Sequence, residues 1–130
     1  MQKPTNILIV DDEKDIEILF RQQFRKDIKT GRIDFQFAFS GEEAIVALSS
    51  KQPPEVVYVF SDINMPGMSG LDLLKKIKVE FPDIKVSLIS AYGNSEYQAQ
   101  AEAHGAEALF TKPIDFKALR QKIDHVVLEN

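Results

Sequence analysis

The fold class is decided by the stretch Asn6-Ile7-Leu8-Ile9-Val10-Asp11-Asp12. A continuous apolar run with β-branched residues is typical of a strand that is buried on both faces of a parallel sheet. Apolar residues then recur at steps of three and four, which predicts a long amphipathic helix that ends near Gly31. The residues of its apolar face are Ile16, Leu19, Phe20, Phe24 and Ile28.

The same alternation of a short apolar run and a longer helical pattern recurs along the chain. Ser40 with Glu43, and Ser69 with Asp72, provide capping signals for two of the helices. The helix over 95–104 is apolar mainly through alanine, so we expect it to pack weakly. Five β/α units predict an α/β fold with an open parallel sheet and helices on both faces, because a closed barrel needs about 250 residues. The further predicted strands are 33–39, 56–60, 86–89 and 108–111.

Composition and charge narrow the class of protein. The chain has 130 residues, of which 44% are hydrophobic and 28% charged, so we expect one globular domain over residues 1–130. Its formal net charge of −4 argues against nucleic acid as a ligand, because phosphates select a basic face. The absence of cysteine excludes disulfides and thiolate metal sites. With no signal-peptide pattern and no run long enough to span a membrane, we expect a cytoplasmic domain without membrane contact.

Polar side chains follow four of the five predicted strands. Asp11 and Asp12 follow the first strand, Asp62 the third, Ser90 the fourth and Lys112 the fifth. Ligands of open parallel sheets bind beyond the carboxyl ends of the strands, so we expect these side chains to meet there. Three crowded carboxylates repel one another unless a cation lies among them, and carboxylate oxygens suit Mg²⁺. Each residue alone has an ordinary structural role, but together they predict a site for a divalent ion and a phosphoryl group.

Four blocks of the sequence, which cover essentially the whole chain in order, resemble the motifs of one family. Together they resemble the CheY-like receiver domains of bacterial two-component response regulators. The resemblance implies a flavodoxin-like (βα)5 fold, with a doubly wound parallel sheet of five strands in the order 2-1-3-4-5. The blocks are Val10-Asp11-Asp12-Glu13, Ser61-Asp62-Ile63-Asn64-Met65-Pro66-Gly67-Met68-Ser69-Gly70, Ser90-Ala91-Tyr92-Gly93 and Gly105-Ala106-Glu107-Ala108-Leu109-Phe110-Thr111-Lys112-Pro113.

The resemblance also implies a role for each acidic position. Asp62 would be the phosphoacceptor and would receive a phosphoryl group from a phosphohistidine of a sensor histidine kinase or of a histidine phosphotransfer protein. Asp12 would ligate Mg²⁺ directly and Asp11 mainly through water, while Asp62 and the backbone carbonyl of Asn64 would complete the protein ligands. Mn²⁺ is the alternative ion. Phosphoryl transfer of this kind needs positioning and charge neutralisation more than covalent help from the protein.

Two further positions would stabilise and read the phosphoryl group. Lys112 would pair with Asp62 and then with a phosphoryl oxygen, and the family pattern implies a cis Lys112-Pro113 peptide bond. Ser90 would turn its hydroxyl to the phosphoryl oxygens and pull the loop after the fourth strand. Such a local electrostatic change biases a two-state element, and we expect the weakly packed helix over 95–104 to move.

The sequence departs from the family pattern at three places. Ser90 stands where threonine is frequent, but the hydroxyl is kept. Leu109 occupies the fifth-strand position where many of these domains carry an aromatic residue, and Phe110 should point to the opposite face. Ser90, Leu109 and Tyr92 are therefore the switch positions that we expect, with Tyr92 or Tyr97 as the aromatic residue that reports the change. The third departure is the stretch 25–32, which lengthens the first helix by about one turn and which we interpret as a solvated helix end.

The predicted function is that of a phosphorylation-switched receiver, and not of an enzyme with a separate substrate. The only chemistry expected is self-phosphorylation from phosphodonors and self-dephosphorylation. The expected output surface is the face of the fourth and fifth helices with the fifth strand. Its partner would be a downstream protein, or an effector domain in the same chain if this domain is part of a longer protein. The domain would be a monomer or a homodimer that forms on phosphorylation.

Four other classes of function remain for comparison. A non-switching receiver-like interaction module would have lost Asp62, Lys112 or the acidic pair. A small aspartyl-phosphate phosphatase would carry its nucleophile in an Asp-x-Asp block after the first strand. A flavin-binding protein of this fold class would have a loop rich in Ser, Thr and Gly in place of Asp11-Asp12. A phosphohistidine carrier would need a reactive histidine, whereas His104 and His125 have the pattern of helix-end and surface residues.

Overall fold

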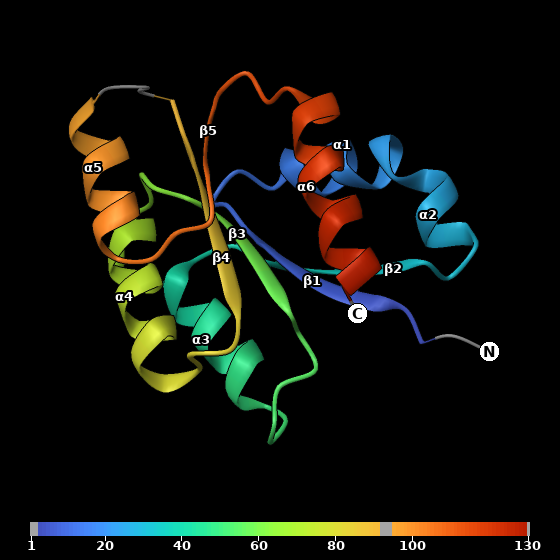
Figure 1. The fold of residues 1–130 in the computed structure, drawn as a ribbon, viewed down its shortest axis with the longest axis horizontal. Helices are drawn as coiled ribbons and strands as arrows, with labels where there is room; N and C mark the ends of the chain where they lie inside the picture. The colour runs from blue at the N-terminus through green and yellow to red at the C-terminus, as the bar shows by residue number, and fades with distance from the viewer. Residues whose placement is uncertain (1–2, 92–94, 130) are drawn as a thin grey trace.

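The computed structural model describes residues 3–91 and 95–129, so Tyr92, one of the predicted switch positions, lies outside the described residues. Five parallel strands form one sheet in the order β2-β1-β3-β4-β5, which confirms the flavodoxin-like fold (Figure 1). The strands are β1 (Thr5–Val10), β2 (Ile33–Ala38), β3 (Tyr58–Asp62), β4 (Lys85–Ser90) and β5 (Leu109–Thr111). The helices are α1 (Asp15–Gln23), α2 (Arg25–Lys29), α3 (Gly41–Ser49), α4 (Gly70–Glu80), α5 (Ser95–Ala103) and α6 (Phe116–Glu129).

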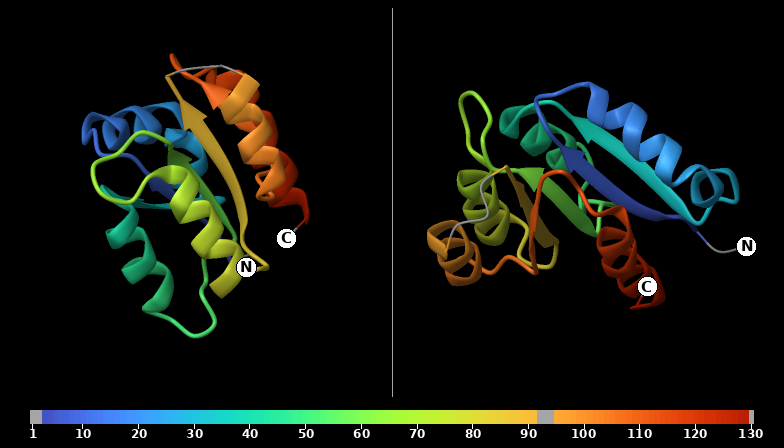
Figure 2. Two further views of the ribbon diagram at one scale, coloured as in Figure 1. Left: turned by 90° about the vertical axis from the view of Figure 1, so that its left-hand side faces the viewer. Right: turned by 90° about the horizontal axis from the view of Figure 1, so that it is seen from above.

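Helices cover both faces of the sheet. The helices α3, α4 and α5 lie on one face and α1, α2 and α6 on the other, as Figures 1 and 2 show. Alternate residues of β1 face the helices on opposite sides of the sheet. Leu8 and Val10 pack with α3 and α4, whereas Ile7 and Ile9 pack with α1 and α6. All four side chains are at most 1% exposed. The continuous apolar run in β1 therefore corresponds to a strand that is buried on both faces.

The first predicted helix is divided in two. The apolar pattern predicted one helix through Ile28, whereas α1 and α2 are separated at Phe24, whose φ and ψ are −114° and 24°. Phe20, Phe24 and Ile28 are spaced four residues apart and would share one face of an unbroken helix as well, so their spacing does not reveal the break. Across the break, Phe24 stays buried and Ile28 stays packed against the same cluster. The fourth and fifth helices of the sequence-based prediction are therefore α5 and α6.

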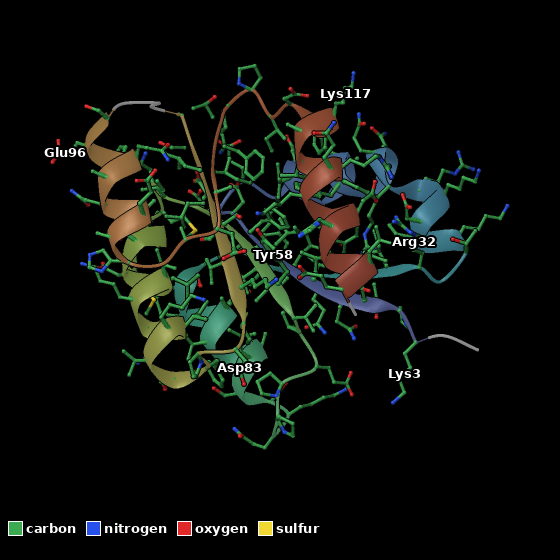
Figure 3. The ribbon with its side chains drawn as sticks, viewed as in Figure 1. Lys3, Arg32, Tyr58, Asp83, Glu96 and Lys117 are labelled. Carbon is green, nitrogen blue, oxygen red and sulfur yellow. The ribbon has the colours of Figure 1, made fainter. Side chains whose placement is uncertain are left out.

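The segment 25–32 is not simply a solvated helix end, which corrects our expectation. Asp27 is 8% exposed, and its carboxylate accepts hydrogen bonds from Arg32 at 2.8 Å and from Arg120 of α6 at 2.9 Å. Arg32, labelled in Figure 3, also pairs with Asp124 of α6 at 2.8 Å. Burial opposes the charge of Asp27, but the two guanidinium groups outweigh it and lower the pKa of the carboxyl. These ion pairs join α2 and the start of β2 to α6.

The small apolar face predicted for α5 is present in the structure. Ala101 is the buried residue of this helix, and Tyr97 packs partly buried against the core on the side of α3 and α4. Few buried side chains mean that little apolar area resists a shift of the helix. No helix in the part of the chain that the structure describes is long and apolar enough to cross a membrane.

Candidate functional site

The side chains predicted to form the site gather at one edge of the sheet. Asp11 and Asp12 directly follow β1, Asp62 is the last residue of β3, Ser90 is the last residue of β4, and Lys112 directly follows β5. The strands β1, β3, β4 and β5 pair in parallel in that order, so their carboxyl ends lie together. The site is therefore built by the topology of the sheet from four segments that are far apart in the sequence.

The ammonium of Lys112 lies between two buried carboxylates. Its Nζ is 3.2 Å from Oδ2 of Asp11 and 3.4 Å from Oδ1 of Asp62. Asp11 and Asp62 are 2% and 5% exposed, whereas Asp12 is exposed to solvent. One carboxylate oxygen from each of the three aspartates lies within 4.8 Å of the other two. The structure thus brings together Asp11, Asp12, Asp62 and Lys112 as the strand-end pattern predicted.

The electrostatics of the cluster oppose the ionisation of Asp62. Burial is the largest cause, and with the neighbouring charge of Asp11 and a smaller effect of Asp12 it raises the pKa of Asp62 to about 6, although Lys112 acts against the rise. Burial also disfavours the charged form of Lys112, but Asp11 and Asp62 outweigh it and raise the pKa of the ammonium. Among the residues that the structure describes, Lys112 pairs with two of the three carboxylates, Asp11 and Asp62, so the cluster favours the arrival of further positive charge.

The donor set fits a hard divalent cation. Mg²⁺ prefers carboxylate and carbonyl oxygens, needs few protein ligands and keeps several waters. Asp12 and Asn64 are both exposed, so the cluster opens to water on one side. Asp11 is held from two directions, because its Oδ1 accepts the N–H of Glu13 at 2.9 Å while its Oδ2 faces Lys112. The direct contact of Asp12 and the carbonyl contact of Asn64 with a metal ion stay predictions.

Ser90 and the segment after β5 are joined through the backbone. Ser90 is fully buried, and its carbonyl accepts the N–H of Lys112 at 2.8 Å. The Lys112-Pro113 peptide bond is cis, as the family resemblance implied. The end of β4 and the segment that carries the ammonium are therefore adjacent in the sheet.

Leu109, the predicted switch position of β5, and the adjacent Phe110 point to opposite faces. Leu109 packs on the side of α3, α4 and α5, in the same cluster as Tyr97. Phe110 packs on the other side, with its ring centroid 6.1 Å from that of Phe60. The predicted alternation is confirmed, so the face toward α5 presents an aliphatic side chain from this strand.

Gly70, which was not singled out from the sequence, supports the backbone of Asp62, the predicted phosphoacceptor. Gly70 begins α4 and packs against the backbone at the end of β3, where a Cβ would lie 2.2 Å from the carbonyl oxygen of Asp62. The N–H of Gly70 donates to the carbonyl of Ile63 at 2.9 Å. The sequence signal was a glycine at the first helical position after the cap Ser69, where a residue with higher helix propensity is usual.

The comparisons with known proteins point to one family. The family model described as response regulator receiver domain matches residues 7–124. Sporulation initiation phosphotransferase F of Bacillus subtilis (strain 168) is 35% identical over 117 residues, which are 90% of this chain and 89% of that protein. Four longer relatives match as well, and the chain spans between 24% and 30% of their length.

Solved structures agree with this assignment. The response regulator protein TrrA from Thermotoga maritima, in complex with Mg(2+)-BeF, is 29% identical with a TM-score of 0.77, and the match covers 93% of this chain and 97% of that one. A response regulator receiver protein from Pseudomonas putida has a TM-score of 0.84 over 96% of this chain and 99% of that one, and at 21% identity it shows the fold alone. The chain belongs to the response regulator receiver domain family, the phosphorylation-switched domains of two-component systems.

Proposed function

We propose that Asp62 is the residue of this receiver domain that accepts the phosphoryl group. The observation that supports the assignment most is the position of its carboxylate, buried at the end of β3 with Asp11 and Asp12 on one side and the Lys112 ammonium 3.4 Å away. A desolvated carboxylate that is paired with a cation is a typical nucleophile in the formation of an aspartyl phosphate. The likeness to a sporulation phosphotransferase adds to this support.

The reaction forms one bond and breaks one. A carboxylate oxygen of Asp62 attacks the phosphorus of a phosphohistidine on the partner, the new P–O bond forms as the P–N bond breaks, and the released imidazole takes up a proton. Lys112 is close enough to move from the carboxylate of Asp62 to a phosphoryl oxygen. The protein contributes positioning and positive charge, which is what such a loose transition state requires.

The metal ligands proposed are Asp11, Asp12, Asp62 and the backbone carbonyl of Asn64. These residues would hold Mg²⁺, with Mn²⁺ as the alternative ion. When bound, the ion supplies positive charge to the oxygens of the phosphoryl group. The proposal is supported by the separation of at most 4.8 Å between the carboxylate oxygens and by the Mg(2+)-BeF complex of the related TrrA protein.

The proposed switch positions are Ser90, Leu109 and Tyr92. An acyl phosphate brings about two negative charges and strong acceptors, so the hydroxyl of Ser90 gains a new partner at the end of β4. The pull on the following loop would shift α5, whose buried face is small. Leu109 lies in the same cluster as Tyr97, so a shift of α5 would change the packing between α5 and β5. Both elements belong to the proposed output face of α5, β5 and α6.

The partners proposed are a sensor histidine kinase or a histidine phosphotransfer protein on the donor side, in the cytoplasm, and a protein target on the output side. The target is a separate protein or a linked effector, as in the longer relative named cyclic di-GMP phosphodiesterase. Neither nucleic acid nor a membrane is a proposed ligand of this domain, which would act as a monomer or as a homodimer formed on phosphorylation.

The test is phosphorylation of the purified chain with acetyl phosphate and Mg²⁺, followed by intact-protein mass measurement and peptide mapping. We expect one phosphoryl group on Asp62, and none after Asp62→Asn. Asp83→Asn is the control, because Asp83 (Figure 3) is exposed in the turn that precedes β4, away from the carboxyl edge of the sheet. Labelling of the Asp62→Asn variant at the wild-type level would refute the assignment.

A further inference from the structure

The loop between β3 and α4, residues 63–69, is held in place by the first turn of α3. The backbone N–H of Met68 donates a hydrogen bond to Oε2 of Glu42 at 3.3 Å. The same carboxylate oxygen lies against Gly67, where a Cβ would be 2.9 Å away. Gly67 has a φ of 76°, a backbone conformation that glycine adopts without strain. The carboxylate therefore contacts two consecutive residues of the loop.

A second contact reinforces the first. Gly41, one residue before Glu42, packs so closely on the loop that a Cβ would lie 2.9 Å from both Cβ and Sδ of Met68. The β3 half of the loop is held by Met65, which is 8% exposed, and the α4 end is also held by the contact of Gly70 with the backbone of β3. The loop is thus attached on both sides of Pro66, and its end nearest α4 is attached to the first turn of α3.

Asn64 lies at the β3 end of the loop, next to Met65 and four residues before Met68. Its side chain is exposed, and its backbone carbonyl is the proposed metal ligand of the loop. A ligand on a loop that is already ordered costs less conformational entropy when the ion binds, and groups that orient metal ligands from outside the coordination sphere change metal affinity. The contacts of Glu42 therefore bear on the metal site, although Glu42 is not among its proposed ligands.

We infer that Glu42 is a positioning residue for divalent metal binding, because its carboxylate holds the Met68 end of the loop that carries the Asn64 carbonyl. The inference rests on the metal site of the proposed function. Glu42 acts through a backbone hydrogen bond and not through its charge, which distinguishes it from a surface carboxylate that attracts cations at long range. Its loss removes one hydrogen bond to the loop, so we expect an affinity for Mg²⁺ that is about two- to tenfold weaker, which is the size of a typical hydrogen-bond contribution.

Three variants separate the hydrogen bond from the charge. Glu42→Ala removes both, whereas Glu42→Gln removes the charge but keeps an amide oxygen that accepts the N–H of Met68. Glu43→Ala is the matched control, since Glu43 carries the same charge on the same first turn of α3. Two measurements apply to each variant: the Kd for Mg²⁺ by calorimetry, and the amide hydrogen exchange of Met68 by NMR in metal-free protein.

We expect Glu42→Ala to raise the Kd about two- to tenfold and to speed the exchange of the Met68 amide, while Glu42→Gln and Glu43→Ala stay close to the unchanged chain. Wild-type affinity in Glu42→Ala would overturn the inference. Equal losses in Glu42→Ala and Glu42→Gln would overturn it too, since they would assign the effect to charge. If the unchanged chain itself binds no Mg²⁺, the proposed metal site fails and this inference fails with it; the other two outcomes leave that site intact.

Discussion

Gly70→Ala tests how closely the start of α4 is coupled to Asp62, the proposed phosphoacceptor. A methyl group at this position would lie 2.2 Å from the carbonyl oxygen of Asp62 and 2.8 Å from the Cα of Ile63. Both contacts are with backbone atoms, which cannot rotate away as the tip of a side chain can. Non-bonded heavy atoms pack at about 3.5 Å, so the end of β3 and the start of α4 would have to separate by about 1 Å.

The size of the effect follows from that displacement. Forcing extra volume into a packed site costs about 1–3 kcal/mol, and the better helix propensity of alanine returns at most about 1 kcal/mol. A shift of about 1 Å in a reacting group lowers a rate by as much as about 100-fold. We therefore expect Gly70→Ala to remain folded, to lose about 1–2 kcal/mol of unfolding free energy, and to be phosphorylated on Asp62 about 10- to 100-fold more slowly.

The assay is the initial rate of labelling by acetyl phosphate at saturating Mg²⁺, with thermal unfolding of the same samples by circular dichroism. Gly41→Ala is the control, because Gly41 also begins a helix after a serine cap. The three atoms nearest to its methyl group would all belong to the side chain of Met68, with Cβ and Sδ at 2.9 Å, so this variant strains the loop after β3 without pressing on the backbone of Asp62. A wild-type rate in Gly70→Ala, or an equal loss of rate in both variants, would show that this backbone contact does not position Asp62.

Three further predictions concern the charged and polar groups of the fold. Asp27→Asn should lower the free energy of unfolding at pH 7 by about 1–3 kcal/mol, because it removes a buried carboxylate that pairs with two partly exposed arginines. The arginines lower the folded pKa of Asp27 below its ordinary value, so the difference from wild type should persist above that ordinary value and shrink as the pH falls through the folded pKa. A constant difference down to pH 2 in urea titrations would contradict this. Tyr58→Phe should lower the free energy of unfolding by about 1–3 kcal/mol, because it leaves the buried hydroxyl of Ser87 without its tyrosine partner. Adding Ser87→Ala should recover part of that loss. Additive losses of the two substitutions in urea titrations would argue against the pairing. In metal-free protein the carboxyl of Asp62 should titrate near pH 6, as measured by carbon NMR. Lys112→Met should raise that midpoint, because Lys112 lowers the pKa of the carboxyl. A lower midpoint would show that Lys112 does not favour the ionised carboxylate.

Much of the candidate site could be predicted because it depends on where the strands end. Apolar runs stop at Asp11, Asp62, Ser90 and Lys112, and parallel strands bring their carboxyl ends to one edge of the sheet. The opposite orientation of Leu109 and Phe110 likewise follows from the alternation of side chains along a strand. These features are local in the sequence, or they follow from a general rule of topology.

Other features depend on distances that no local pattern contains. The predicted solvated helix end was wrong for Asp27, because its partner Arg120 is 93 residues away and approaches only when α6 packs beside α2. The break at Phe24 was not predicted either, because Phe24 and Ile28 pack against the same cluster and their spacing suits an unbroken helix equally well.

The sequence alone determined the alternation of strands and helices, the residues at each strand end and hence the chemistry that they can perform, because hydrophobic periodicity and strand polarity are properties of the chain itself. The tertiary structure decided how those residues are supported. It placed Lys112 between Asp11 and Asp62, seated Gly70 on the backbone of Asp62, and brought Glu42 to the neighbouring loop. Each of these contacts joins separate elements, and its length depends on how those elements pack to within about 1 Å, which local sequence rules do not specify.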